Sequence, residues 1–284
     1  MFNKIFKGIL FTTLLFSIAS NIYAFVPPSS PYDDPPDSYT SLQLSFDEAD
    51  GSTTTDDESS NNFTVTNNGN VQTDTAQYKW TGSSLHDGTG DYWTVPDNNV
   101  FAFGSGDFTV DLWFRENTAK NAFLCAQNGA TLADTSFWIK LNFGDTITGT
   151  ICDGTNLKEV TTAGGLATAT WYHAALVRSG NTLTIYRDGT GTNLDITGVT
   201  IPDCTKAPAI GVDGNDYGVG HDGWIEELRI SKGIARDWAL PTGFIMVVYG
   251  VNIGSPNMIG TPLWSCRIKL EKLWRNFSWK YLRG

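Results

Sequence analysis

Strand-length runs of alternating apolar and polar residues limit most strongly what this chain can fold into. Clear runs occupy residues 41–46, 108–114, 137–143 and 183–186, and they are rich in Thr, Val, Ile and aromatic side chains. Such alternation places one face of a strand on a core and the other on solvent. Asp-Gly and Asn-Gly pairs, which accept the positive φ of tight hairpin turns, recur between the runs. About twelve short strands at this spacing predict an all-β fold, a two-sheet antiparallel sandwich.

The first 24 residues have the pattern of a secretory signal peptide. Two lysines precede an apolar run at residues 9–18, and Ala24 supplies a small residue at the expected cleavage point. The run is shorter than the roughly 20 apolar residues that span a bilayer. We therefore expect a secreted or cell-surface protein with no transmembrane span, with an uncleaved anchor as the alternative. Residues 25–40 contain five prolines and predict an extended linker.

The predicted body, residues 41–240, and the predicted tail, residues 241–284, differ in charge. Between residues 40 and 240, 26 acidic side chains outnumber 11 basic ones, and this excess disfavours nucleic acid as a partner. The tail carries six basic side chains and one acidic one. Its last 18 residues place apolar side chains on one helical face. We interpret residues 241–284 as an atypical basic appendage, with a slipped reading frame as the alternative.

Export would place the cysteines in an oxidising compartment. The chain has four of them, Cys125, Cys152, Cys204 and Cys266, and four cysteines allow three pairings that the sequence does not distinguish. None lies in a Cys-x-x-Cys pair, which disfavours a zinc site or a redox motif. We expect either one or two structural disulfides or buried free thiols.

Five short motifs in the chain occupy residues 44–48, 82–96, 101–113, 171–189 and 223–233. Together they cover roughly residues 42–238 and resemble the laminin-G-like jellyroll domains of the concanavalin A-like lectin/glucanase superfamily. The resemblance implies a jellyroll sandwich that serves as an exported binding or adhesion module.

The resemblance also implies a calcium site made of turn carboxylates and carbonyls. Calcium takes six to eight oxygen ligands, and glycines in a turn let carbonyl groups point inward. Two positions depart from the family pattern, because His86 replaces an aromatic or aliphatic residue and Glu226 replaces an aspartate. Alternatively, the aspartates cap turns without binding a metal. The predicted ligands are Asp47, Asp87, Gly88, Asp91 and Glu226.

A carbohydrate or glycoconjugate is the ligand class that the resemblance implies. Sugar sites combine an aromatic platform with a few polar groups. Each aromatic residue in or beside a turn could instead pack in the core or at a sheet edge. The predicted ligand-binding residues are Tyr92, Trp93, Tyr217, His221 and Trp224.

The chain lacks the pattern of an enzyme. Laminarinase-type glycoside hydrolases with this sandwich fold resemble one another in a Glu-x-Asp-x-Glu strand, and no such run occurs here. We interpret residues 108–113 as a core strand and His173 as a structural residue. The sequence therefore predicts no catalytic residues. The alternative function is a structural or protein–protein assembly domain of a cell-surface or phage-related protein; exposed aromatic residues on the concave sheet would favour sugar, and a flat apolar patch would favour protein.

Overall fold

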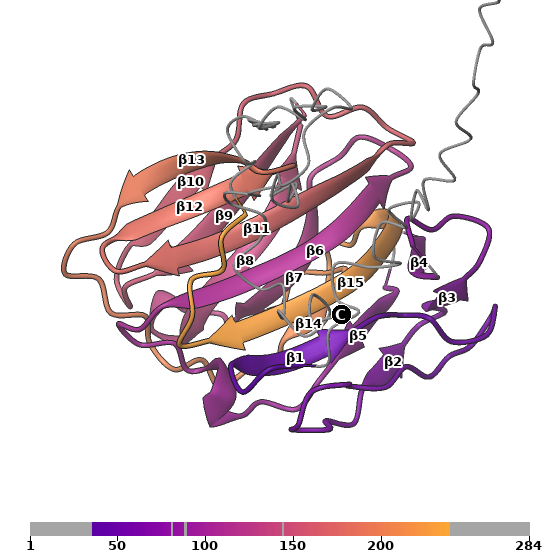
Figure 1. Cartoon of the computed structure of the whole chain (residues 1–284), viewed down its shortest axis with the longest axis horizontal. Coiled ribbons are helices and arrows are strands. Elements are labelled where there is room, and N and C mark those ends of the chain that lie inside the picture. The colour runs from indigo at the N-terminus through magenta and orange to yellow at the C-terminus, as the bar shows by residue number, and fades with distance from the viewer. Residues whose placement is uncertain (1–35, 81, 88–89, 144, 239–284) are drawn as a thin grey trace, which may run out of the picture.

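The computed structural model describes residues 36–80, 82–87, 90–143 and 145–238. The predicted signal peptide, residues 25–35 of the predicted linker and the predicted tail lie outside these ranges. Two antiparallel sheets lie face to face, with the larger sheet toward the viewer in Figure 1. The prediction of an all-β, two-sheet sandwich is confirmed. Within the described ranges, no helix has the length and apolar character needed to cross a membrane.

The larger sheet has eight strands, in the order β13-β12-β11-β6-β15-β4-β3, with β1 also paired to β15. Strands β11, β6 and β15 run side by side across its centre (Figure 1). Its strands are β1 (Thr40–Leu44), β3 (Gln72–Asp74), β4 (Ser83–Asp87), β6 (Phe108–Glu116), β11 (Trp171–Ser179), β12 (Thr182–Arg187), β13 (Thr190–Asp195) and β15 (Asp222–Lys232).

The smaller sheet has seven strands, in the order β10-β9-β8-β7-β14-β5-β2. Two short 3-10 helices, η1 (Asn99–Phe101) and η2 (Leu132–Asp134), lie in the connections. The strands are β2 (Thr66–Asn68), β5 (Tyr92–Thr94), β7 (Ala122–Asn128), β8 (Thr135–Asn142), β9 (Thr146–Cys152), β10 (Leu157–Thr161) and β14 (Ala209–Ile210).

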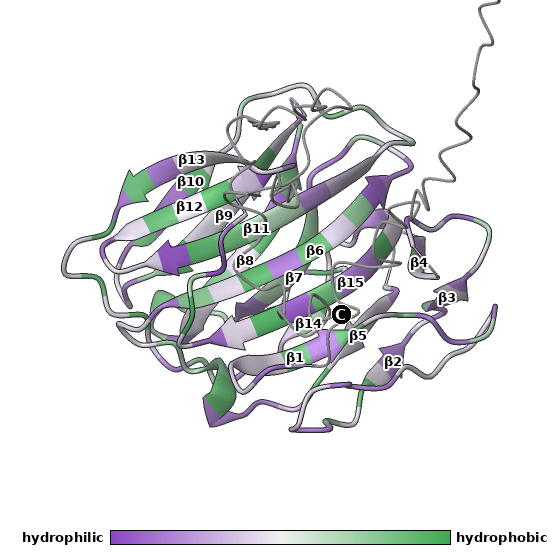
Figure 2. Ribbon diagram, in the orientation of Figure 1, coloured by the Kyte–Doolittle hydropathy of each residue, from purple (hydrophilic) through white to green (hydrophobic). Residues whose placement is uncertain are grey.

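The core fills the space between the inner faces of the two sheets. Every second side chain of β6 points into this core, and four of these side chains are fully buried: Phe108, Val110, Leu112 and Phe114. The alternation of green and paler or purple residues along β6 and β15 in Figure 2 shows the same period. Since neighbouring strand residues point to opposite faces, the intervening side chains of β6 belong to the outer face of the larger sheet.

A β-bulge interrupts the pairing of β15 with β6. Glu226 pairs with Trp113 and Arg229 pairs with Asp111, so the register shifts between them. Glu227, inside the bulge, has a φ of 53°. A bulge inserts an extra residue and re-aims the side chains around it. As a result Glu226 and Arg229, three positions apart, both lie opposite outward-facing residues of β6.

The three described cysteines are buried free thiols. Burial raises the pKa of Cys125 to about 12 and, as the largest cause, that of Cys204 to about 11. Because the thiolate is the reactive form, these two side chains are inert at neutral pH. No disulfide joins Cys125, Cys152 and Cys204, which agrees with the buried-thiol alternative for this part of the chain. Cys266 lies outside the described residues.

Candidate functional site

Four aromatic rings form a continuous row on the outer face of the larger sheet. We call Trp80, Trp113, His173 and Trp238 the aromatic row. The ring centroids of Trp80 and Trp113 are 6.0 Å apart, with the planes at 80°. Trp113 and His173 follow at 5.2 Å, and His173 and Trp238 at 4.3 Å. The row therefore crosses the centre of the sheet from the β3–β4 connection to the segment after β15.

Strand pairing accounts for the middle of the row. Trp113 and His173 are direct cross-strand partners on β6 and β11. Trp113 also pairs with Glu226 on β15. Because Phe114 and Leu112 point into the core, Trp113 between them points outward.

Glu226 anchors the segment that carries Trp80. This carboxylate is fully buried, and its oxygens accept the backbone N–H groups of Lys79 at 2.5 Å and Trp80 at 2.7 Å. The Lys79 ammonium in turn lies 4.8 Å from the ring centroid of Trp113, a cation–π contact. Glu226 thus holds an aromatic ring and a cation over the middle of the sheet.

Asp111 and Arg229 place a charged pair beside the row. The Nε and Nη2 atoms of Arg229 each lie 3.3 Å from a carboxylate oxygen of Asp111, which is fully buried. His173 Nε2 lies 3.9 Å from the same carboxylate. The Arg229 guanidinium also lies 5.6 Å from the ring centroid of Trp238. These contacts fix the second half of the row, as Glu226 fixes the first.

The tryptophans of the row have polar groups that the described part of the protein does not satisfy. The rings of Trp80, Trp113 and Trp238 are partly exposed. Their indole N–H groups are buried and have no acceptor among the described residues. A buried donor without a partner costs about 1–3 kcal/mol. Groups of this kind call for an explanation in a native structure, but the N–H of Trp138 on the smaller sheet likewise has no acceptor in the described part of the chain. It is therefore the joining of three such rings in one row that distinguishes this face.

Two of the five predicted ligand-binding residues come together. The rings of Tyr92 and Tyr217 stack at a centroid distance of 4.6 Å with their planes 4° apart, and both are partly exposed. Burial, with a smaller contribution from Tyr217, raises the pKa of Tyr92. This tyrosine pair belongs to β5 and the β14–β15 connection, so it is separate from the aromatic row.

The other three predicted ligand residues are buried, which favours the packing role that the sequence left open as the alternative. Trp93 is fully buried, with its Nε1 donating to Ser84 Oγ at 2.6 Å. Trp224 is 9% exposed and donates to Asp74 at 2.8 Å. Burial, followed by nearby His86 and Lys120, lowers the pKa of His221 from 6.5 to about 3. None of these rings is presented as an open platform.

His86, the first departure from the family pattern, is also a fully buried residue. Its ring lies 3.0 Å from the Asp91 carbonyl oxygen and 3.1 Å from Ser84 Oγ. Gly211 has a φ of +85°, and a Cβ there would collide with the His86 ring. A glycine is therefore required for the imidazole to take this core position.

Three of the predicted calcium ligands, Asp47, Asp91 and Glu226, each accept hydrogen bonds from a different part of the chain. Asp47 is exposed and accepts from Ser45 Oγ at 3.2 Å, while Asp91 is buried and accepts the backbone N–H of Asn70 at 2.6 Å. Glu226 accepts from the 79–80 segment on the outer sheet face. Among the described residues, no three His, Cys, Asp or Glu side chains form a group that could hold a metal ion. The Asp87 side chain and Gly88 lie outside that description, so calcium binding stays a prediction.

Sequence reasoning did not select the aromatic row. Residues 108–113 do form a strand, but only its even-numbered side chains belong to the core, and Asp111 and Trp113 point outward. That parity was available from the alternation itself. No sequence pattern indicated the bulge that brings Arg229 beside Asp111. None indicated that residues 79–80 pack on the outer face of β6 and β15.

Comparison with known proteins identifies the family. The Laminin_G_3 family, described as the concanavalin A-like lectin/glucanases superfamily, matches residues 87–237, just over half of the chain. No curated protein matches the sequence.

Several solved structures share the fold at low sequence identity. The botulinum neurotoxin serotype D binding domain is 16% identical at a TM-score of 0.54, over 69% of this chain and 48% of that one. The binding domain of Paraclostridial Mosquitocidal Protein 1 is also 16% identical, at a TM-score of 0.56, over 70% and 50%. This chain therefore spans about half the length of these two binding domains.

A third structure is matched over nearly its whole length. It is domain 4 of AbnA, a GH43 extracellular arabinanase from Geobacillus stearothermophilus, in complex with arabinotriose, with 21% identity and a TM-score of 0.53. The match covers 70% of this chain and 94% of that one. With its two antiparallel sheets and the family match, this chain belongs to the concanavalin A-like lectin/glucanases superfamily.

Proposed function

We propose that this protein is a non-catalytic binding module that holds a saccharide or glycoconjugate across the aromatic row. The observation that carries the proposal is three partly exposed tryptophan rings, joined through the buried His173 ring, on the outer face of the sheet beside Lys79 and Arg229. Sugar rings present C–H groups to aromatic faces and hydroxyl groups to polar side chains, and this face offers both kinds of partner.

The comparisons support the ligand class. The superfamily includes lectins by description, and the matched arabinanase domain was solved with arabinotriose. A related neurotoxin binding domain, serotype DC, was solved with rat synaptotagmin II. A protein ligand on the same face is therefore the alternative that the binding experiment must also test.

The non-catalytic part of the proposal rests on the carboxylates of the same face. Glycoside hydrolysis needs one carboxyl group to donate a proton and another to act as nucleophile or base. Here Asp111 accepts from Arg229, and Glu226 accepts two backbone N–H groups. Both carboxylates thus hold protein groups in place, a structural use of their oxygens.

The test compares Trp113→Ala with Trp138→Ala. Trp138, on β8, is also partly exposed and lies edge-on to Phe123 at 6.0 Å, but it belongs to the other sheet. A glycan array would find the saccharide, with arabinotriose as the first probe for calorimetry. Interface hot spots contribute about 2 kcal/mol or more, so we expect roughly 30-fold weaker binding for Trp113→Ala. Trp138→Ala should keep the wild-type affinity.

Three outcomes would contradict this proposal. They are full saccharide affinity in Trp113→Ala, equal losses in both variants, and an array without signal. If the array gives no signal, a protein ligand that the wild type binds and Trp113→Ala does not bind would establish the protein-binding alternative. Export and calcium assistance remain predictions that these measurements do not address.

A further inference from the structure

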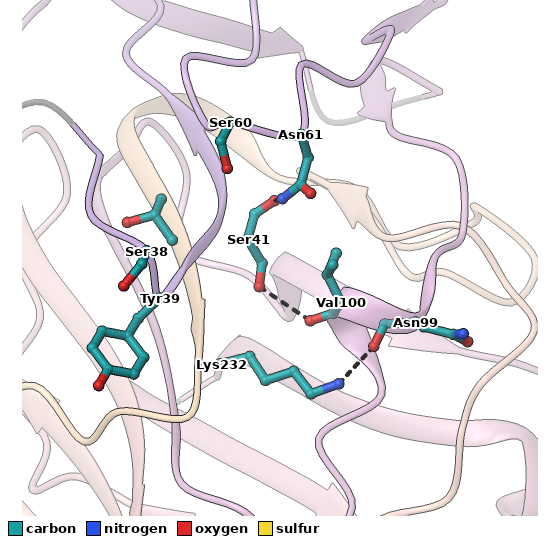
Figure 3. A pocket seen from close by; sticks show the side chains of 9 residues that line it. Ser38, Tyr39, Ser41, Ser60, Asn61, Asn99, Val100 and Lys232 are labelled. Carbon is teal, nitrogen blue, oxygen red and sulfur yellow. Dashed lines mark hydrogen bonds between the residues drawn. The ribbon is translucent and has the colours of Figure 1, made fainter.

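A polar pocket opens at the end of the sandwich where β1 begins and β15 ends. Its volume is about 280 Å³, slightly below the roughly 300–1,000 Å³ of sites for drug-sized ligands, so it suits one sugar residue. Figure 3 shows side chains from β1, η1, β15 and the loop at Ser60 surrounding it. The lining residues are Ser38, Tyr39, Thr40, Ser41, Ser60, Asn61, Asn99, Val100 and Lys232.

The charge of this pocket is opposite to that of the body around it. Its nine lining residues include one cation, Lys232, and no carboxylate. Lys232 Nζ donates to the Asn99 carbonyl at 2.6 Å (Figure 3), and an ammonium has three donor hydrogens. The nearby Asp37 carboxylate is paired with Arg236 at 2.9 Å. At contact distance the Lys232 ammonium attracts an anionic ligand group, while the acidic body around the pocket repels anions at longer range.

The remaining groups match a sugar better than a bare ion. The hydroxyls of Ser38 and Ser60 and the Asn99 amide make no hydrogen bond within the described part of the chain, and all three residues are exposed. The Asn61 amide donates to the Ser41 carbonyl at 2.9 Å, which leaves its oxygen as an acceptor. The pocket therefore offers both donors and acceptors to a ligand.

Tyr39 adds an aromatic face at the rim. Its side chain is 47% exposed, and its ring edge lies beside Gly233. The Tyr39 backbone is fixed on both sides, since its N–H donates to Asp37 at 3.0 Å and its carbonyl accepts from Lys232 N–H at 2.9 Å. These bonds fix the Tyr39 backbone at the end of β15, while the Lys232 ammonium points away from the Tyr39 ring, toward Asn99 (Figure 3).

We infer that this pocket is a second binding site, specific for a carboxylate-bearing sugar residue such as a uronic acid. Lys232 pairs with the sugar carboxylate, the serine and asparagine side chains bind the hydroxyls, and Tyr39 contacts the apolar face of the ring. The site shares no residue with the aromatic row and does not depend on it.

The test measures D-glucuronate, D-glucose and sodium acetate binding to the full chain by titration NMR. We expect saturable glucuronate binding, at least tenfold weaker binding of glucose and acetate, and further weakening at high salt. Lys232→Gln keeps a donor for the Asn99 carbonyl and removes the charge, and should weaken glucuronate binding at least tenfold. Lys206→Gln, at an exposed lysine elsewhere, should not change it.

The inference is overturned if glucose or acetate binds as tightly as glucuronate, or if Lys232→Gln has no effect. Tyr39→Ala should also weaken glucuronate, and an unchanged affinity there would remove the sugar part of the assignment. The two proposals fail separately, because Trp113→Ala should keep glucuronate binding and Lys232→Gln should keep binding at the aromatic row.

Discussion

Trp93 and Trp113 show two contrasting uses of tryptophan in this sandwich. Trp93 faces the core from β5, is fully buried and donates its N–H to Ser84. Trp113 faces away from the core on β6, is partly exposed, and its N–H has no acceptor among the described residues. The first environment satisfies every requirement of the ring and serves stability. The second leaves ring surface and a donor unused, which suits binding.

Trp93→Ala should have the largest effect on stability. Removing a buried Trp or Phe side chain from a core costs about 3–5 kcal/mol, and here Ser84 also loses its donor. Urea unfolding followed by circular dichroism measures the change. Trp93→Phe keeps most of the packing, so it should recover much of the stability that Trp93→Ala loses. If Trp93→Ala keeps the wild-type stability and loses ligand affinity, the contrast between Trp93 and Trp113 is wrong, because the Trp93 ring would then be a binding platform.

Buried His221, whose ring centroid lies 6.2 Å from that of His86, should make the fold sensitive to acid. Its folded pKa of about 3 lies below the unfolded 6.5, so between these pH values the unfolded state holds the extra proton. Stability then falls as pH falls, by about 1.4 kcal/mol per pH unit and by roughly 2 kcal/mol between pH 6.5 and 5.

Unfolding free energies across pH 4–8 test this for the wild type and His221→Asn. The variant should have a smaller slope below pH 6.5, whatever its absolute stability, and the same slope above pH 7.5. Equal slopes at acid pH would show that His221 is not the titrating group. Saccharide affinity at pH 7 should be similar in both proteins, provided that both are folded.

Glu226→Gln should affect the aromatic row more than the core. The amide keeps the shape but turns one acceptor into a donor facing the N–H of Lys79 or Trp80. Hydrogen bonds to charged groups contribute about 1.5–3 kcal/mol. We therefore expect the free energy of unfolding to fall by an amount near the lower end of this range, and saccharide binding to weaken several-fold. Glu159→Gln on the other sheet, where the carboxylate accepts from Thr150, is the matched control. Unchanged affinity would mean that Trp80 needs no anchor.

The sequence predicted the fold well because the alternation of residues such as Phe108 and Val110 is local and repeated. It did not select the proposed aromatic row, and the reason is physical. The family motifs around Asp91 and Trp93 are turn and core chemistry, which the structure uses for packing and hydrogen bonding. The row depends on non-local events, namely the bulge at Glu227 and the return of Trp80 over β6. No residue spacing along the chain reports either event.

Tyr217 offers the smallest and most discriminating change. It has a φ of 57° and stacks on Tyr92. Tyr217→Ala removes the ring but keeps the strained backbone, and should cost about 1 kcal/mol, since aromatic pairs contribute roughly 0.5–1.5 kcal/mol. Tyr217→Gly also removes the ring but accepts the positive φ, so it should be more stable than the alanine variant by a similar amount.

Thermal unfolding of both variants separates the stacking contribution from the backbone strain. If arabinotriose or an array-selected saccharide is held by the aromatic row alone, both variants keep the wild-type affinity. A fall of affinity in both, despite their different stabilities, would instead make the tyrosine pair part of the ligand site, as the sequence predicts. Since the two variants differ in backbone strain and share the missing ring, such a loss can only come from the ring itself.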